Sequence, residues 1–231
     1  MLRRFPGCIL QGSGGALSAS DSSPGGFDLD SLGAELNGYL DCSQQALGKI
    51  EVESVALFTS KVIEAWHEDR QVIVFGNGGS AATSTHLAED LATYAIPFSE
   101  SKRLRILSLN ESPSIITALG NDIDFDAIFT QQVQQWARAG DLVLTLSGSG
   151  NSSNLVAAIE RAREIGCLTA AMTGFNGGRL RELVDISLHV EVDEMQSAQD
   201  AHMVMVHMII HGFRVAVRNI LAERATGRAG S

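Results

Sequence analysis

Histidine, carboxylate and amide side chains recur at helical spacing in two separate stretches of the chain. His86 and Asp90 are four positions apart in one helical pattern, so both side chains project from one face of a helix. Gln199 and His207 are eight positions apart in a second pattern and also share a face. Two imidazoles and a carboxylate are the usual protein ligands of a catalytic metal that keeps an open position, and Gln199 would add a further oxygen.

The second stretch also has a simpler interpretation. His202, His207 and His211 lie among methionine, valine and isoleucine residues, and a single histidine in such a helix is most often a core residue. Spacing alone does not show whether the two helices meet. The sequence therefore leaves both interpretations open, and the combination of residue types favours a metal site.

Four polar loops follow short apolar runs and are rich in glycine, hydroxyl and amide side chains. They are 76–80 (GNGGS), 110–112 (NES), 147–153 (SGSGNSS) and 173–178 (TGFNGG). The loop 147–153 leads into a helical pattern whose first N–H groups have no partner within the helix, so it is suited to bind phosphate. The alternative is an ordinary turn in which Ser152 or Ser153 caps the helix. Two loops of this kind in one sheet favour the phosphate site.

The first loop also matches a loosened dinucleotide-binding pattern, Gly76-x-Gly78-x-x-Ala81. In that pattern a ribose-binding acid follows roughly 20 residues later, whereas Glu111, after the next strand, comes about ten residues too late. Two helical patterns also precede the first strand, which a dinucleotide domain does not require. We therefore discount a dinucleotide.

The elements that position these loops alternate along the chain. Short apolar runs predict buried parallel strands at 71–75, 104–109, 141–146, 167–172 and 185–192. Helical patterns lie at 80–94, 125–139, 152–165, near Leu180 and at 196–222. This alternation predicts an α/β fold, a doubly wound, mostly parallel five-stranded sheet flanked by helices, with binding loops at the carboxyl ends of its strands.

The N-terminal part divides into a tail and two leading helices. Residues 1–27 have too little apolar surface to offset the entropy of ordering them, so they predict a disordered tail. Leucines at helical spacing from Leu29 to Leu47 predict one amphipathic helix, and residues 52–66 predict a second. We expect a single domain over 28–223, including these helices and a long C-terminal helix, followed by a flexible tail over 224–231.

Composition and charge exclude several classes of protein. The 231 residues carry a net charge of -10 at pH 7, which argues against nucleic-acid binding because phosphate backbones demand clustered Lys and Arg. No stretch approaches the ~18 uninterrupted apolar residues of a membrane span. The three cysteines have neither a disulfide framework nor metal-ligand spacing, and we expect no secretion signal and a cytoplasmic protein.

Taken in order, six motifs resemble the sugar isomerase (SIS) domain family and, within it, the phosphoheptose isomerases. The motifs are FGNGGSA (75–81), HLAED (86–90), GND with a following IF (120–129), AGDLVLTLSGSGNSSN (139–154), TGFNGG (173–178) and the pair Gln199 and His207. The resemblance extends over residues 29–217 and leaves only the tails outside it.

The resemblance implies an aldose–ketose isomerase that interconverts sedoheptulose 7-phosphate and D-glycero-D-manno-heptose 7-phosphate through a metal-assisted enediol. It implies Asp90 and His207 as the proton-transfer pair, and one zinc ion per site held by His86, Asp90, Gln199 and His207. It also implies a homo-oligomer, expected to be a tetramer with sites between subunits and with the N-terminal helices in its core. The implied substrate-binding positions are Asn77, Gly78, Gly79, Ser80, Asn121, Asp122, Ser147, Gly148, Ser149, Ser152 and Gln199, with the four serines at the phosphate.

This chain departs from the family pattern at the sugar end of the expected site. Asp90, Gly148 and Tyr94 stand where the family commonly has Glu, Thr and Arg. The shorter carboxylate would move a proton acceptor by about 1 Å, which is enough to alter a rate sharply. These departures favour a variant substrate or a specialised branch over loss of phosphate binding.

Two other functions are compatible with the resemblance. One is a non-catalytic SIS-domain protein that binds a sugar phosphate or a protein partner such as a bacterial replication initiator. The retained set His86, Asp90, Gln199 and His207 argues against it. The other is a sugar-phosphate sensor, which would usually be attached to a DNA-binding module that this acidic chain does not show.

Overall fold

The structure, a computed structural model, describes residues 28–226. The expected N-terminal tail, residues 1–27, and residues 227–231 of the expected C-terminal tail therefore lie outside the described residues. The last helix continues to Ala225, two residues past the expected end of the domain at residue 223.

Five parallel strands form the central sheet, which confirms the predicted fold class. They are β1 Gln71–Gly76, β2 Arg105–Ser108, β3 Leu142–Ser147, β4 Leu168–Thr173 and β5 Ile186–His189. The strands lie in the order β2-β1-β3-β4-β5, and every neighbouring pair is parallel. The chain order reverses between β1 and β3, and in open α/β sheets ligands bind at the carboxyl ends of the strands at such a reversal.

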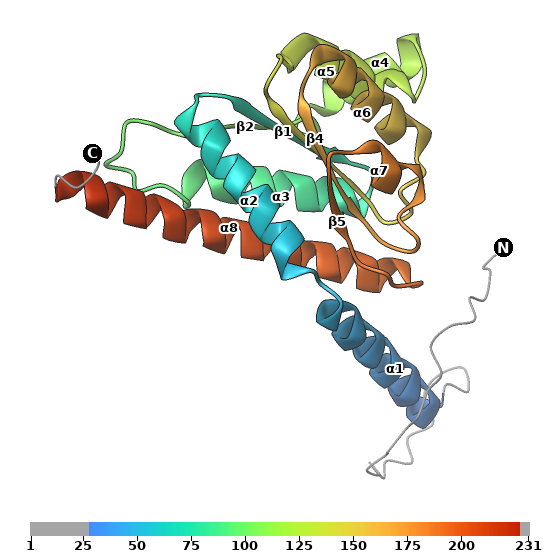
Figure 1. The fold of residues 1–231 in the computed structure, drawn as a ribbon. Helices are drawn as coiled ribbons and strands as arrows, with labels where there is room; N and C mark the ends of the chain where they lie inside the picture. The colour runs from blue at the N-terminus through green and yellow to red at the C-terminus, as the bar shows by residue number, and fades with distance from the viewer. Residues whose placement is uncertain (1–27, 227–231) are drawn as a thin grey trace.

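Helices cover both faces of this sheet (Figure 1). They are α1 Leu29–Gly48, α2 Val52–His67, α3 Gly79–Thr93, α4 Pro113–Asp122, α5 Ala127–Trp136, α6 Ser153–Ile165, α7 Gly178–Leu183 and α8 Met195–Ala225. Side chains of α2, α3 and α8 pack on one face, and those of α4, α5, α6 and α7 pack on the other. The strand side chains alternate accordingly, because Val72 and Val74 join the first cluster while Ile73 and Phe75 join the second.

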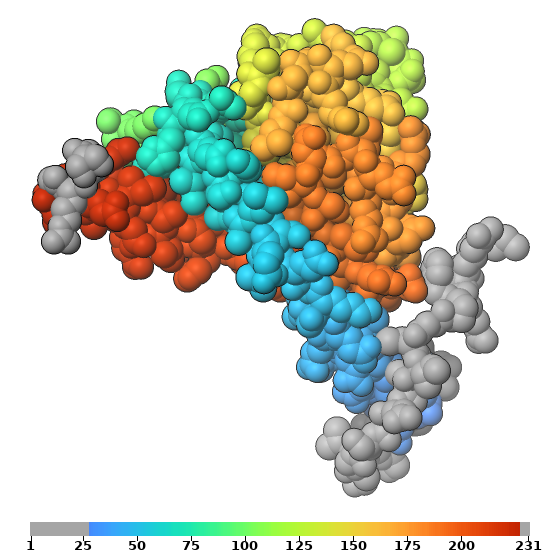
Figure 2. All heavy atoms as spheres, viewed as in Figure 1, coloured from blue at the N-terminus to red at the C-terminus, as the bar shows by residue number. Residues whose placement is uncertain are grey.

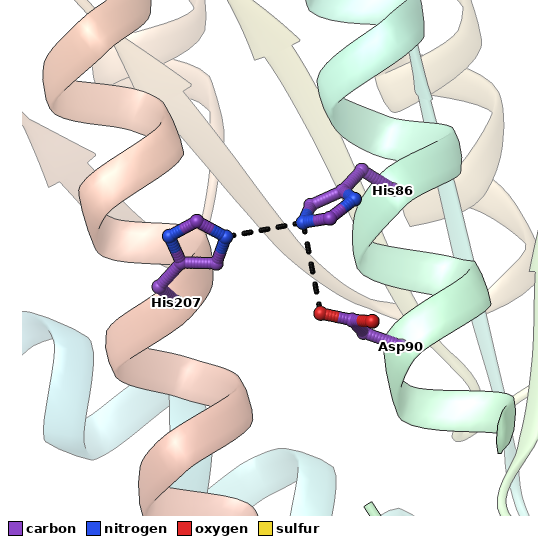
Figure 3. A group of neighbouring side chains, drawn as sticks. All are labelled: His86, Asp90 and His207. Carbon is purple, nitrogen blue, oxygen red and sulfur yellow. Dashed lines mark hydrogen bonds and ion pairs between the residues drawn. The ribbon is translucent and has the colours of Figure 1, made fainter. Parts of the chain in front are cut away.

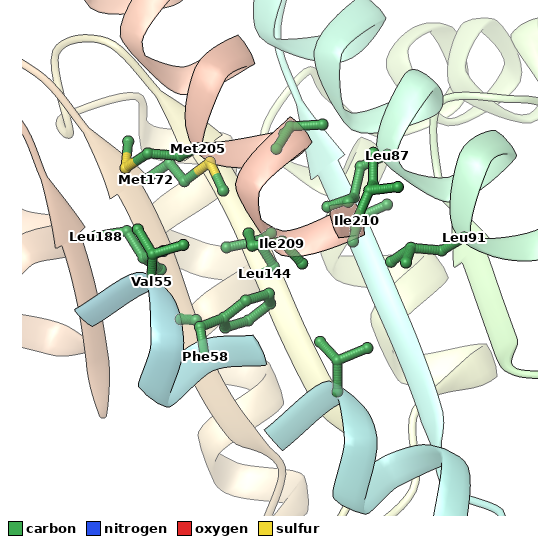
Figure 4. Packing of buried hydrophobic residues seen from close by; sticks show 14 of the residues in the cluster. Val55, Phe58, Leu87, Leu91, Leu144, Met172, Leu188, Met205, Ile209 and Ile210 are labelled. Atoms are coloured by element: carbon green, nitrogen blue, oxygen red, sulfur yellow. The ribbon is translucent and has the colours of Figure 1, made fainter. Parts of the chain in front are cut away.

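The long helix α8 is the centre of the first face. Figure 4 shows Met205 and Ile209 of α8 between the strands and the helix α2, beside Phe58 and Leu144. Phe58, Leu144 and Ile209 are fully buried, and burying a side chain of this kind stabilises the fold by about 1.5–3 kcal/mol. By length and composition alone α8 would pass as a membrane span, but its apolar face belongs to this core.

Helix α1 contacts α8 through polar groups and leaves apolar groups uncovered. Tyr39 Oη donates a hydrogen bond to Asp200 Oδ2 at 2.5 Å, and Ser43 Oγ donates to the same oxygen at 3.1 Å. Figures 1 and 2 show α1 extending away from the sheet as an arm. Five of its leucines are 38–61% exposed, namely Leu29, Leu32, Leu36, Leu40 and Leu47. A row of exposed leucines on one helix marks a surface suited to a protein partner.

Candidate functional site

The polar loops after β1, β3 and β4 lie at one edge of the sheet and are bonded to one another. The backbone N–H of Gly174, after β4, donates to the carbonyl of Gly148, after β3, at 2.9 Å. Asn77, after β1, and Asn154, in the first turn of α6, exchange two amide hydrogen bonds of 2.9 and 3.0 Å. The expectation that these loops meet at the carboxyl edge of the sheet is therefore confirmed.

The loop after β3 has the features of an anion site. The Oγ of the buried Ser147 accepts a hydrogen bond from the backbone N–H of Gly150 at 3.1 Å, which folds the loop back on itself. Gly150 has a φ of +67°, and its Cα lies against the backbone of Gly177, so no side chain fits there. Ser152 is the N-cap of α6, but its side chain makes no capping hydrogen bond. The hydroxyl and the first N–H groups of α6 are thus available to a ligand.

The loop after β1 is fixed by a residue that the sequence analysis did not single out. Asn110, just after β2, accepts from the backbone N–H of Gly76 at 3.1 Å and donates to the Gly76 carbonyl at 2.9 Å. Its Oδ1 also accepts from Ser84 Oγ of α3 at 2.9 Å. Asn110 therefore sets the position of the turn that carries Gly78, Gly79 and the buried Ser80.

A group of three possible metal ligands lies between α3 and α8 (Figure 3). His86 and Asp90 come from α3 and His207 from α8, and one ligand atom of each lies within 4.8 Å of the other two. His86 Nε2 is 3.1 Å from His207 Nε2 and 3.6 Å from Asp90 Oδ2. The structure thus brings together two helices whose contact could not be read from spacing. Two imidazoles and a carboxylate at this separation fit a zinc ion.

The amide of Gln199 lies beside the loops. A Cβ placed on Gly79 would be 2.7 Å from Gln199 Oε1, so this side chain rests on the first residue of α3. Gly79 precedes His86 by seven residues, which is about 10 Å along a helix. The role of Gln199 as a metal ligand stays a prediction, and its place beside Gly79 is suited to a ligand that reaches from the loops towards His86.

Asn121 and Asp122 lie on the other side of the sheet from the metal group. They end α4, a helix that was not expected from the sequence, and both are exposed, with Asn121 Nδ2 donating to Asp122 Oδ1 at 2.8 Å. Ile116 and Leu119 of α4 pack against the α5 and α6 face, opposite α3 and α8. Within one chain the structure therefore does not bring these two residues to His86, and their substrate-binding role stays a prediction.

The fold and the site define a class, the sugar isomerase domains of the α/β type. Residues 39–174 match the SIS domain family. The chain belongs to the SIS domain family.

The relatives within the family are more specific. The chain is 35% identical over 176 residues to a probable phosphoheptose isomerase of Thermoplasma volcanium, which covers 76% of this chain and 88% of the relative. It is 40% identical over 155 residues to a phosphoheptose isomerase of Pelobacter propionicus, covering 67% and 81%. Among solved structures, a phosphoheptose isomerase from Neisseria gonorrhoeae matches with a TM-score of 0.71 and 29% identity, covering 80% of this chain and 97% of that one. A phosphoheptose isomerase from Francisella tularensis gives the same TM-score at 25% identity.

Proposed function

We propose that this protein is an aldose–ketose isomerase of sugar phosphates that interconverts sedoheptulose 7-phosphate and D-glycero-D-manno-heptose 7-phosphate. One observation carries the proposal: Asp90 and His207 come from different helices and meet through His86, on a helix that begins at the glycine- and serine-rich loops. The names of the relatives at 35–40% identity support the same reaction.

The substrate's phosphate would bind where the loops after β1 and β3 meet. Ser80, Ser147, Ser149 and Ser152 supply hydroxyls there, and the N-termini of α3 and α6 supply N–H groups. The phosphate does not react, but its binding energy holds the distant carbons in place.

The length of the substrate matches the separation of the two ends of the site. His86 lies about 10 Å along α3 from its first residue. Seven bonds join C2 of a heptulose 7-phosphate to its phosphorus, and at the spacing of 3.80 Å per three bonds they span about 9 Å. A pentose 5-phosphate has two bonds fewer and reaches only about 6 Å. The geometry therefore favours a sugar phosphate longer than a pentose 5-phosphate, as sedoheptulose 7-phosphate is.

The proton transfer requires one group at carbon and one at oxygen. We assign Asp90 as the base that takes the proton from the carbon next to the carbonyl and returns a proton to the neighbouring carbon. His207 exchanges protons with the two oxygens, so the enediol forms and collapses without net gain or loss of protons. One oxygen of Asp90 faces His86 at 3.6 Å, and the second oxygen is left for this work.

A zinc ion would fit among His86, Asp90 and His207, with Gln199 as the further ligand that we propose. When bound, it would supply a Lewis acid that stabilises the oxyanion.

We also propose that the protein is a homotetramer with sites between subunits. The exposed leucines of α1 support this, because a second copy of the same helix would cover them. A charge in the middle of that row, Leu36→Glu, should shift the protein to a smaller species in light scattering. Glu35→Gln, on the neighbouring residue, is the control, and an unchanged mass for Leu36→Glu would contradict the arrangement.

We place the enzyme in the cytoplasm. Within residues 28–226 the two cysteines, Cys42 and Cys167, are both free thiols, as a reducing compartment favours.

The decisive experiment is exchange of the carbon-bound proton. Metal-replete protein with sedoheptulose 7-phosphate in deuterated water should incorporate deuterium next to the carbonyl, and Asp90→Asn should lower the rate about 100-fold or more. Glu89→Gln, an exposed neighbour outside the metal group, should exchange normally. No exchange by the wild type, or an unchanged rate for Asp90→Asn, would refute the proposal.

Metal content gives a second, independent readout. The wild type should retain about one zinc per chain after dialysis, and His207→Ala should lose it, while His211→Ala, an exposed histidine one turn further along α8, should keep it. Absence of both zinc and exchange would favour a non-catalytic SIS-domain protein.

A further inference from the structure

The first two turns of α8 lie against three of the loops, and in each loop one glycine lies close to an α8 side chain. A Cβ on any of these glycines would enter the space of an α8 side chain; the pairs are Gly79 with Gln199, Gly174 with Ala198 and Gly148 with Met195. The contact between Gly148 and Met195 is the tightest, because the Met195 sulfur occupies the position where a side chain at residue 148 would begin. Side chains of α8 thus occupy the space that side chains at these three loop positions would fill.

Gly148 lies between Ser147 and Ser149, in the middle of the loop that we assign to the phosphate. Met195 and Ser149 also line one pocket of about 380 Å³, together with Asn151, Phe175, Asn176 and the carboxylate Asp193, so of the four serines assigned to the phosphate this pocket includes only Ser149. Met195 is 37% exposed, so it is an accessible wall and not a core residue. Its thioether touches the loop at Gly148 and faces the pocket beside Ser149.

We propose that Met195 is a further substrate-binding residue for the sugar phosphate, because its thioether occupies the space left by Gly148 and forms an apolar wall beside Ser149 of the phosphate loop. This inference rests on the proposed function. An apolar wall excludes water from the serine hydroxyls and N–H groups of the loop, and their interactions with an anion are stronger where water is excluded. The wall would affect binding of the phosphate end of the substrate. It lies away from the carbons that would react near His86, so its loss should change KM and not kcat.

The substitution Gly148→Ala tests the wall without a direct change to Met195. The φ of Gly148 is outside the left-handed region, so alanine fits the backbone. The added Cβ would meet only the sulfur and terminal methyl of Met195, which are the flexible end of a side chain, so the fold can accommodate it by moving Met195. We expect KM to rise about fivefold with kcat retained, a value within the range of coupling between contacting residues.

Two variants of Met195 complete the test. Met195→Ala removes the wall and should raise KM, and the Kd for inorganic phosphate in calorimetry, by a similar factor. The double variant Gly148→Ala with Met195→Ala should be no worse than either single variant, because both act through one side chain. Met195→Leu, of similar volume, should restore KM to near the wild-type value.

Ser149→Ala separates this inference from the proposed function. If inorganic phosphate does not bind the wild type, or binds Ser149→Ala equally well, the loop is not the phosphate site and the inference about Met195 fails with it, whereas the isomerase itself is decided by the exchange assay. If Ser149→Ala weakens binding but Met195→Ala leaves Kd and KM unchanged, the wall alone is refuted. Multiplying effects in the double variant, or a loss in kcat instead of a rise in KM, would refute it as well.

Discussion

His202 of α8 makes the stability of this protein depend on pH. Its side chain is 1% exposed, and neither ring nitrogen has a hydrogen-bond partner within the described residues. Burial lowers the pKa of His202 to about 4, and the nearby His189 reinforces the shift; the Thr173 backbone opposes it in part, although it makes no hydrogen bond to the ring. A buried imidazole without a counter-charge is stable only in its neutral form.

The sign follows from the two protonation equilibria. In the unfolded chain the pKa returns to about 6.5, so between about pH 6.5 and pH 4 the unfolded state binds the extra proton and the folded state does not. Above about pH 6.5 the ring is neutral in both states, so His202 does not lower the free energy of unfolding. Below that pH the unfolded state is stabilised by protonation, so the free energy of unfolding falls as pH falls, and the decrease levels off below about pH 4. Between pH 7 and pH 5 the free energy of unfolding should fall by about 2 kcal/mol from this residue alone.

The measurement is urea denaturation at pH 7 and pH 5, for the wild type and for His202→Leu. Leucine does not titrate, so between pH 7 and pH 5 the free energy of unfolding should fall by about 2 kcal/mol less in the variant than in the wild type. This difference does not depend on the absolute stability of the variant. His211→Leu, at an exposed site on the same helix, is the matched control. Runs at two protein concentrations separate unfolding from dissociation of an oligomer. Equal losses in the wild type and in His202→Leu would refute the reasoning, as would a pKa near 6.5 for His202 by NMR.

Two further predictions concern polar contacts that the sequence did not reveal. Asn110→Ala leaves the N–H and carbonyl of Gly76 without their partner and should lower the free energy of unfolding by about 2 kcal/mol or more in urea, and an unchanged midpoint would contradict this. The pKa of Tyr39 is raised, chiefly because its hydroxyl donates to Asp200, so a spectrophotometric titration in a Tyr94→Phe background should show a phenol above its usual pKa of about 10. Asp200→Asn should bring that pKa down, and an unchanged titration would show that the contact does not form in solution.

The sheet could be predicted from the sequence because each strand is a short apolar run followed by a polar loop. The β3 residues 142–147 are all buried, so the strand is a nearly continuous apolar run and not an alternation of apolar and polar residues. Helix α4 could not be predicted in the same way. It is only 10 residues long, Pro113 stands in its first turn and residues 120–122 (GND) end it, so the apolar residues Ile116 and Leu119 lie between residues that are typical of loops.

Spacing along one helix predicts only the part of the candidate site that is local, and the grouping of His207 with His86 came from residue types and the family resemblance. His86 and Asp90 share a helix face by spacing, and the structure confirms their proximity. Asn110 and Gly76 are 34 residues apart and meet because β1 and β2 pair in one register. The pair Gly148 and Met195 depends in the same way on the path of α8 across the sheet edge. Such contacts are set by tertiary packing, which no local pattern encodes.

Among the helices that begin near the loops, α3, α6 and α8 have N-termini that differ in a way that explains how an acidic protein would bind an anion. Glu194 caps α8 and accepts from the N–H of Gln196 at 3.1 Å, so the N-terminus of that helix already holds a carboxylate. Neither α3 nor α6 has a side-chain cap, although Ser152 is the N-cap residue of α6 and Ser153 is its first residue. Their unpaired N–H groups carry the positive end of each helix dipole, and a phosphate between them would act as the cap that both lack. A net charge of -10 does not prevent this. Salt largely screens charges that lie more than about 10 Å from the ligand, whereas these N–H donors would be in contact with it.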